Sequence, residues 1–265
     1  MIQQEATRDR TSIIEELSHL RLLAAQSPFL HRAQTWPRGY VGDFETIQYI
    51  IDGANKARPG TPGHVIEEFF LRADICAQHR HKIAAQSRAI AEALMRLPAA
   101  SILSIGCGSS EDLQQNVSAV VAGGAHITLI DADADAIACS VNALTAAARQ
   151  ITARHGNIYK VIRSLTEQYD LIMMGGVADY LSDRVLCAVL RSLRHHLLPG
   201  GVLFFTNIDA GNPYRIAMEY LANWLLIERS EAQLRDIAIS AGWPASGIAV
   251  QEDPTGLSHL ITLAA

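Results

Sequence analysis

A run of small and acidic residues near the middle of the chain has the composition of a ligand-binding loop. The run Gly106-Cys107-Gly108-Ser109-Ser110-Glu111-Asp112 follows a short apolar segment, Ser101–Ile105, and precedes a helical pattern. Glycine lets a backbone approach a ligand closely, and in open α/β sheets ligands bind beyond the carboxyl ends of the strands. We therefore expect Gly106, Cys107, Gly108 and Ser109 to contact a bound small molecule.

The acid at position 111 narrows the choice of ligand. A dinucleotide fingerprint reads G-x-G-x-x-G and places a pyrophosphate over the helix N-terminus. Here Glu111 takes the place of the third glycine, and its carboxylate would repel a pyrophosphate but suit a ligand that carries an amine. This disfavours an NAD-dependent oxidoreductase. It favours S-adenosylmethionine (SAM), whose methionine end carries an ammonium and a sulfonium, with Glu111 among the cofactor-binding residues.

A second acidic segment follows the next strand-like run. In Leu129-Ile130-Asp131-Ala132-Asp133, an acid at the strand end can accept both ribose hydroxyls of an adenosine. Aspartate is also a good helix N-cap. We assign Asp131, with its neighbour Ala132, to the cofactor, and Asp133 to the cap of the following helix.

Two further segments complete the expected cofactor site. Asn157, followed by Ile158, comes after the third strand-like run, where a side-chain amide could meet the adenine. Asparagine is also common in turns, so this assignment rests on its register with the other segments. Gly175 and Gly176 follow the fourth run and leave room for the cofactor where its methyl group is delivered.

Alternating strand and helix patterns must position these loops. Seven strand-like runs are separated by helical segments, which indicates βαβ units. We predict an α/β fold with a Rossmann-like, seven-stranded, mostly parallel sheet flanked by helices, and a SAM-binding domain over residues 98–265. The predicted strands are 101–105, 126–130, 151–154, 170–174, 201–206, 248–252 and 259–263.

Residues 1–97 have a helical pattern throughout. Apolar residues recur at helical spacing from Ile13 to Ala24. A second helix is expected from about Asp43 to about Gly53, and a long helix over 64–97 with a break near Asp74. We predict an all-helical lid domain over 1–97, which could also form a homodimer.

Composition limits the class of partner. The chain has 265 residues, 49% of them hydrophobic, and a net charge of −5. Nucleic-acid binding normally leaves a basic footprint, and no apolar run is long enough to cross a bilayer. The scattered cysteines and histidines form no metal-ligand pattern. We expect a cytoplasmic protein with a small-molecule substrate and no nucleic acid, membrane or metal partner.

The four cofactor segments, taken in order, look like those of a class I SAM-dependent methyltransferase. The stretch Pro37-Arg38-Gly39-Tyr40-Val41-Gly42-Asp43 resembles the RGYxGD segment of bacterial methyltransferases associated with biosynthesis of a 3-hydroxypalmitic acid methyl ester. The resemblance spans roughly residues 28 to 242. It implies SAM as methyl donor and S-adenosylhomocysteine as product.

The resemblance also implies an acceptor site. Tyr40, Asp43 and Glu219 are the expected catalytic residues. The chain departs from the family at Ser109, where proline is common, and at Ala178, where phenylalanine is usual, so the acceptor stays open. The expected substrate-binding residues are Tyr40, Asp43, Tyr180, Asn207, Asn212, Met218, Glu219 and Trp224.

The acids of that set favour a cationic acceptor. Asp43, Glu45 and Glu219 could hold an amino or guanidino group, because carboxylates match a guanidinium's donor fork. We therefore expect N-methylation of an amino-acid or guanidino group in natural-product metabolism. The alternative is O-methylation of a carboxylic or hydroxy fatty acid to a methyl ester, with Arg38, Arg80 or Arg215 as the counter-charge.

An alternative of another class is a non-catalytic, SAM-binding regulatory protein. The intact Asp131 and the loop Gly175-Gly176 argue against it. If the nucleophile needs a general base, His31, His79 and His81 could titrate near neutral pH.

Overall fold

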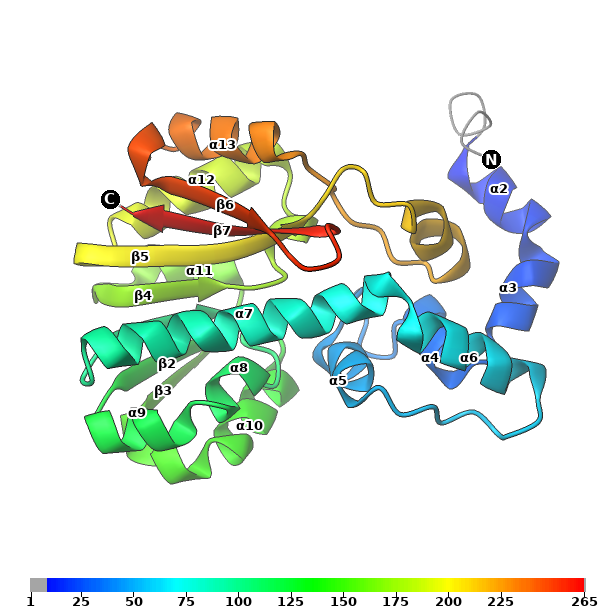
Figure 1. The fold of residues 1–265 in the computed structure, drawn as a ribbon, viewed down its shortest axis with the longest axis horizontal. Coiled ribbons are helices and arrows are strands. Elements are labelled where there is room, and N and C mark those ends of the chain that lie inside the picture. Colours follow the sequence, from blue (N-terminus) through cyan, green and yellow to red (C-terminus); the bar gives the residue numbers. More distant parts are fainter. Residues whose placement is uncertain (1–8, 265) are drawn as a thin grey trace. The chain divides into compact units, whose positions relative to one another are not determined.

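The computed structural model describes residues 9–264, which form two compact units (Figure 1). Unit 1 contains the described residues up to Arg80 together with Gly211–Leu226. Unit 2 contains His81–Ala210 and the chain from Ile227 onward. The chain therefore passes between the units three times.

Unit 2 is built on a seven-stranded sheet with the order β3-β2-β1-β4-β5-β7-β6. Only β7 runs antiparallel to its neighbours, so the prediction of a Rossmann-like, mostly parallel sheet is confirmed. The strands are β1 (Ser101–Ile105), β2 (His126–Asp131), β3 (Ile151–His155), β4 (Tyr169–Met174), β5 (Leu197–Ile208), β6 (Ile248–Glu252) and β7 (Ser258–Ala264).

Strand β5 differs most from its predicted bounds. The sequence Pro199-Gly200-Gly201 indicates a turn, yet the strand already begins at Leu197. The pairing with β4 accommodates these residues by a register shift between Tyr169 and Leu171. Tertiary pairing thus overrides a local turn signal.

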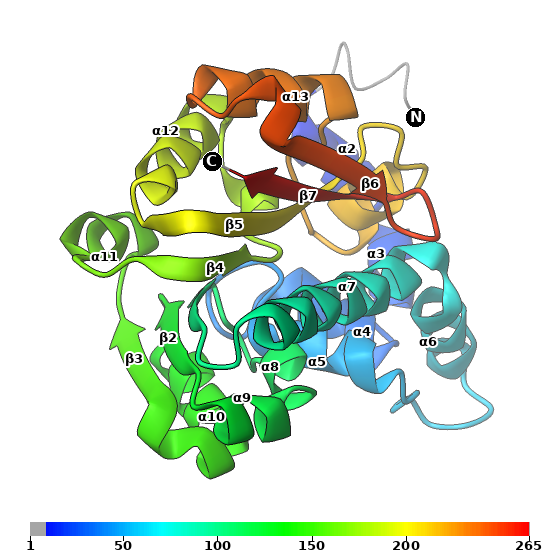
Figure 2. The same cartoon turned by 60° about the vertical axis from the view of Figure 1, so that its left-hand side comes forward.

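Alternate residues of each strand feed two apolar layers, as the period of a strand requires. Leu103, Ile172 and Phe205 join the cluster beneath α11, α12 and α13, whereas Ile102 and Leu171 join the opposite cluster with α7 to α10 (Figure 2). The helices are α7 (Asp74–Arg96), α8 (Glu111–Gln114), α9 (Val117–Gly123), α10 (Ala134–Ala143), α11 (Ile158–Ser164), α12 (Asp183–Arg194) and α13 (Glu231–Ser240).

Unit 1 is helical in its described part, as expected for the N-terminal region. The apolar pattern from Ile13 to Ala24 is divided between two helices at Leu17, and the break expected near Asp74 lies at Ala73. Within residues 9–264, no helix is both long and apolar enough to span a membrane. The helices are α2 (Arg10–Glu16), α3 (Ser18–Ala24), α4 (Pro28–Thr35), α5 (Phe44–Asp52), α6 (Pro62–Arg72) and the π-helix η3 (Ala217–Leu221).

A buried acid joins the helices of unit 1. Glu67, fully buried on α6, accepts hydrogen bonds from the Ser27 hydroxyl and the Phe29 amide at 2.9 and 3.1 Å, and from the Tyr49 hydroxyl and the Lys56 amide at 2.6 Å each. Burial alone would raise the pKa of Glu67, but these four donors lower it below its ordinary value. One carboxylate thus ties α4, α5 and the loop before α6 together.

A buried cation has the corresponding role in unit 2. The Arg229 guanidinium donates to the carbonyl oxygens of Ala178 and Leu181 and, at 2.7 Å, to Oδ1 of Asn207. Its Nε lies 2.9 Å from Asp183. Arg229 therefore fixes the loop after β4, the end of β5 and the chain that returns from unit 1.

Replacing Arg229 by Met should destabilise unit 2 strongly. The substitution leaves the three acceptors Ala178 O, Leu181 O and Asn207 Oδ1 without their donor, so we expect a loss of about 3–5 kcal/mol in the free energy of unfolding. Urea denaturation measures it. The control Arg72→Met removes an exposed i,i+4 ion pair with Glu68 and should cost less than about 0.5 kcal/mol. Equal losses for Arg229→Met and Arg72→Met would contradict the conclusion that the buried hydrogen bonds of Arg229 stabilise unit 2.

Candidate functional site

The glycine loop turns sharply at the end of β1. Gly106 and Gly108 have φ angles of +64° and +54°, a region that side-chain-bearing residues rarely adopt. The amides of Gly106 and Cys107 donate to the carbonyl oxygen of Ile130, at 2.8 and 3.2 Å, which ties the loop to β2. The predicted loop is therefore formed at the carboxyl edge of the sheet.

Asp131 lies beside that loop, at the end of β2. One carboxylate oxygen accepts from the Gly108 amide at 2.9 Å, and the other accepts from the Asp133 amide at 2.9 Å. Burial, more than the Asp133 charge, raises the pKa of Asp131, while the two amides act in the opposite direction. Each carboxylate oxygen can still accept a further hydrogen bond. Asp133 caps α10 as predicted.

Two other side chains in the loop are buried and differ in chemistry. Burial raises the pKa of the Cys107 thiol to about 12, so this cysteine stays protonated and is not a nucleophile near neutral pH. Burial also raises the pKa of Asp112 to about 6, although the Leu113 amide donates to its carboxylate.

The remaining cofactor segments lie at the carboxyl ends of β3 and β4. Asn157 is exposed, and its side-chain oxygen caps α11, the helix that begins at Ile158. A Cβ on Gly175 would lie 2.1 Å from the Gln86 amide oxygen, so a side chain there would require Gln86 to move. The Gly176 amide donates to the Thr206 hydroxyl at 3.2 Å. The topology thus brings all four predicted segments to one edge.

The acids expected to hold a cationic acceptor lie in unit 1 and are paired with arginines. Asp43 is almost fully buried, caps α5 through the Thr46 amide and contacts Arg32 at 2.7 Å. Glu45 contacts Arg32 at 2.6 Å and Arg38 at 3.4 Å. The RGYxGD segment therefore also has a structural role: it contains the N-cap of α5, and ion pairs with arginines hold that end of the helix in place.

Glu219, on the π-helix η3, has a similar environment. It lies 3.4 Å from Arg10 and 4.0 Å from Arg215. Tyr40 and Tyr180, also expected at the acceptor site, are exposed by 38% each. Asn207 is fully buried, and its amide donates to the carbonyl oxygens of Ile208 and Ile227.

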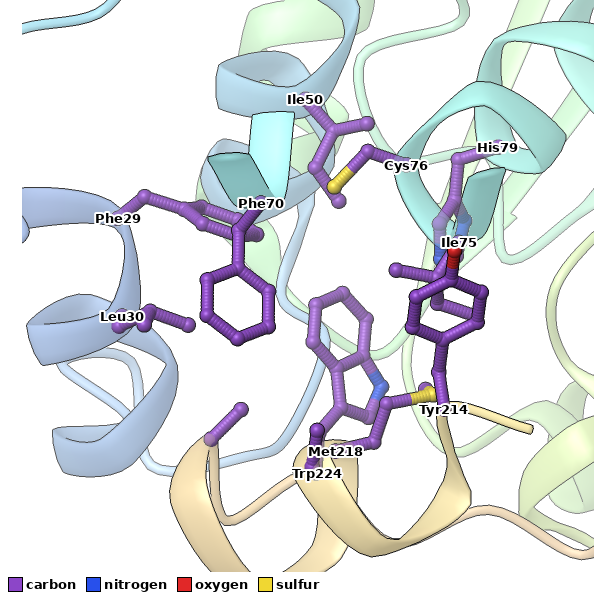
Figure 3. A pocket seen from close by; sticks show the side chains of 12 residues that line it. Phe29, Leu30, Ile50, Phe70, Ile75, Cys76, His79, Tyr214, Met218 and Trp224 are labelled. Carbon is purple, nitrogen blue, oxygen red and sulfur yellow. The ribbon is translucent and has the colours of Figure 1, made fainter. Parts of the chain in front are cut away.

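Unit 1 contains an apolar pocket that brings two of the predicted acceptor residues together. Met218 and Trp224 line it, with Asn212 donating to the Met218 sulfur at 3.4 Å. The pocket has a cavity volume of about 30 Å³. Figure 3 shows the Phe70, Tyr214 and Trp224 rings converging on it. The lining is Phe29, Leu30, Ile50, Phe70, Ile75, Cys76, His79, Tyr214, Ala217, Met218, Ala222 and Trp224.

Sequence reasoning missed several residues at these sites. His79, considered only as a base, stacks on Trp224 with ring centroids 5.5 Å apart. Lys82 and Gln86 lie one turn apart on α7 and are both buried. The available signal was a row of polar residues at i,i+4 spacing, Gln78, Lys82 and Gln86, on a helix that packs against the sheet.

Two histidines form pairs with aspartates in unit 2. Nδ1 of His81 lies 3.0 Å from Asp253, and Nε2 of the buried His259 lies 2.7 Å from Asp209. Asp253 and His259 belong to the same β6–β7 hairpin, which is therefore tied to the start of the unit and to the end of β5. Both pairs have a structural role of this kind.

Comparison with known proteins agrees with this geometry. Residues 103–203 match a family model described as a methyltransferase domain. No curated protein sequence matches the chain.

Solved structures resemble the chain at low sequence identity. A Bordetella parapertussis protein described as a possible exported protein has a TM-score of 0.68 at 18% identity, and the match covers 98% of each chain. Magnesium protoporphyrin IX methyltransferase from Synechocystis PCC 6803 with bound SAH has a TM-score of 0.59 at 16% identity, over 83% of this chain and 93% of that one. N,N-8-amino-8-demethyl-D-riboflavin dimethyltransferase from Streptomyces davawensis has a TM-score of 0.50 at 14% identity, over 83% and 68%.

These findings define the fold of the chain. The region that matches the methyltransferase-domain model includes the glycine loop and Asp131. The similar solved structures show the same Rossmann-like fold as the methyltransferase from Synechocystis. The narrower resemblance to the 3-hydroxypalmitic acid methyl ester group stays a prediction.

The buried Asp112 should make stability depend on pH. An unfolded chain ionises this carboxyl near the ordinary aspartate pKa of 3.8, whereas the folded protein keeps the proton up to about pH 6. The free energy of unfolding should therefore fall as pH rises from about 4 to 6. The variant Asp112→Asn, which keeps an acceptor for the Leu113 amide, should gain about 1–3 kcal/mol over the wild type at pH 7.5 and nothing below pH 4.

Urea denaturation across this pH range measures the difference. Asp135→Asn, at an exposed aspartate in the first turn of α10, is the matched control and should follow the wild-type pH profile. If the free energy of unfolding of Asp112→Asn depends on pH in the same way as that of the wild type, the Asp112 carboxyl is not the source of the pH dependence.

Proposed function

We propose that the protein transfers a methyl group from SAM to a small-molecule acceptor. The observation that carries the proposal is the arrangement of Asp131 beside the Gly106–Gly108 turn, with its carboxylate held at 2.9 Å by the Gly108 and Asp133 amides. A carboxylate fixed at the end of β2 is suited to accept two ribose hydroxyls. Glu111, at the start of α8, supplies a negative charge beside the turn.

The residues fit SAM better than a dinucleotide. Glu111 lies at the loop where a dinucleotide would place its pyrophosphate, and its carboxylate would repel that group, whereas an acid such as Asp131 suits the ribose of either cofactor. When bound, SAM supplies an electrophilic methyl group on a sulfonium. Gly176, where no atom of residues 9–264 beyond its chain neighbours lies within 4 Å of a Cβ position, leaves backbone surface on which the amino-acid portion of SAM can lie. The contribution of these residues is alignment, and positioning of this kind supplies about 7–11 kcal/mol towards a displacement.

The environment of the predicted acceptor residues supports an acidic acceptor with an apolar body. Asp43, Glu45 and Glu219 are each paired with arginine, so their charge is already compensated. Met218 and Trp224 line a pocket of carbon and sulfur. We therefore favour O-methylation of a carboxylic or hydroxy fatty acid. N-methylation of an amino or guanidino group is the second candidate, supported by the loose 4.0 Å contact of Glu219 with Arg215.

Removing the Asp131 carboxylate should weaken cofactor binding. Hydrogen bonds to a charged group are strong, so Asp131→Ala should lower the affinity for S-adenosylhomocysteine by about 10- to 100-fold. Calorimetric titration measures it. Asp131→Asn, which retains one acceptor oxygen, should have an affinity between those of the wild type and Asp131→Ala. Asp135→Asn should bind S-adenosylhomocysteine as tightly as the wild type does. Unchanged affinity in a folded Asp131→Ala protein would show that Asp131 does not bind the ribose hydroxyls.

The acceptor class can be decided with a matched panel. We expect mass spectrometry to detect methyl transfer from SAM to 3-hydroxydecanoate or decanoate but not to arginine or guanidinoacetate. Glu219→Gln and the surface control Glu231→Gln should both change kcat/KM for the acid by less than about threefold. Methylation of the guanidines, with a more than tenfold rise in KM on Glu219→Gln, would instead establish the cationic acceptor.

A further inference from the structure

Within residues 9–264, the ammonium of a largely buried lysine at the carboxyl edge of the sheet has no hydrogen-bond partner. The Lys82 side chain, on α7, is 5% exposed. Its Nζ lies 3.6 Å from Oδ2 of Asp179, and within the described part of the chain it makes no closer polar contact. A direct ammonium–carboxylate hydrogen bond spans about 2.7–2.9 Å. The pair is therefore an ion pair without a hydrogen bond.

Such an ammonium has donors that only solvent or a ligand can occupy. Lysine has three N–H donors, and the Lys82 nitrogen is not fully shielded, so a ligand can reach it. Asp179 cannot move freely towards Lys82, because its other oxygen accepts from the Ile208 amide at 2.7 Å. The carboxylate is thus fixed by β5, and the ammonium is left with donors to offer.

The surroundings of Lys82 belong to the edge where the proposed site lies. Asp179 follows β4, and Ile208 is the last residue of β5. One turn along α7 from Lys82, the Gln86 amide lies against Gly175 in the space that a side chain there would fill. The ammonium therefore stands beside the loop that contains Gly175 and Gly176, on the same edge as Asp131.

We propose that Lys82 binds a carboxylate of a ligand of this site. The inference rests on the proposed methyltransferase function and goes one step further, because it assigns the Lys82 ammonium as the partner of a carboxylate on the bound ligand. Two ligands can supply that carboxylate: the amino-acid end of the cofactor, and an acidic methyl acceptor. In either case the ligand oxygen accepts hydrogen bonds from the N–H donors that Asp179 leaves unused, and Asp179 orients the ammonium.

Three titrations separate the two sources. S-adenosylhomocysteine and 5′-methylthioadenosine share the adenosine, but only the first has the carboxylate. If Lys82 holds the cofactor, Lys82→Met should weaken S-adenosylhomocysteine binding by about 10- to 100-fold and leave methylthioadenosine unchanged. If Lys82 instead holds the acceptor, Lys82→Met should bind both nucleosides as tightly as the wild type does. Its affinity for decanoate, measured with and without S-adenosylhomocysteine, should then fall by a factor similar to that given above.

Variants that balance the charge separate binding from folding. The double variant Lys82→Met/Asp179→Asn removes both charges and keeps an acceptor for the Ile208 amide, so it should fold where Lys82→Met alone is unstable. It should show the same ligand-specific loss. Lys82→Arg should retain most of the affinity. Lys56→Met, at an exposed lysine 4.0 Å from Asp52, is the control and should change none of the titrations.

The outcomes distinguish this inference from the proposed function. If S-adenosylhomocysteine and decanoate both bind folded Lys82 variants as tightly as the wild type, the ammonium is a structural ion pair and the inference is overturned. If the wild type binds decanoate through Lys82 but binds neither nucleoside, the carboxylate site stands and the methyltransferase proposal fails. If the wild type binds none of the three ligands, both are overturned.

Discussion

The buried guanidinium of Arg229 is the interaction on which the site of unit 2 depends. It contacts the loop after β4 at two carbonyls and the end of β5 at Asn207. These two segments begin at the carboxyl edge, where ligands of parallel sheets bind. A planar cation with five donors can join several acceptors at fixed angles, so the loop that contains Asp179 is held by its backbone rather than by packing alone.

Two buried charges, one in each unit, have their hydrogen bonds supplied by the protein. Glu67 is satisfied by four donors in unit 1 and Arg229 by four acceptors in unit 2. Buried charges are tolerated when their hydrogen bonds are complete. Lys82 lacks that completion, which sets it apart from the charges that only hold the fold together.

The sequence predicted unit 2 well because its signals are local. The strands have short apolar runs bounded by glycine or aspartate, and the bounds of β1 and β6 match the prediction. Asp133 and Asp43 act as helix caps for the same reason. The glycine turn and Asp131 meet because parallel strands end at a common edge.

The acceptor residues were harder, because their roles depend on partners far away in the chain. Glu219 is paired with Arg10, and Asn207 with Arg229, so a carboxylate or an amide that suggests a ligand site in the sequence is already engaged in the fold. No spacing rule shows such pairs in advance. Lys82 was overlooked for the converse reason, since a single lysine in a helix normally reaches solvent.

The discontinuity of unit 1 has a consequence for how the chain matures. Residues up to Arg80 form one part of the unit, and Gly211–Leu226 arrives only after strands β1 to β5 have been made. Until then the apolar wall of Phe29, Ile50 and Phe70 lacks Met218 and Trp224, which later bury it. During synthesis this apolar surface stays exposed until a segment distant in sequence has been made, and a nascent chain with exposed apolar surface is prone to aggregation. Unit 2 is completed later still, because Arg229 and strands β6 and β7 follow Gly211–Leu226 in the chain.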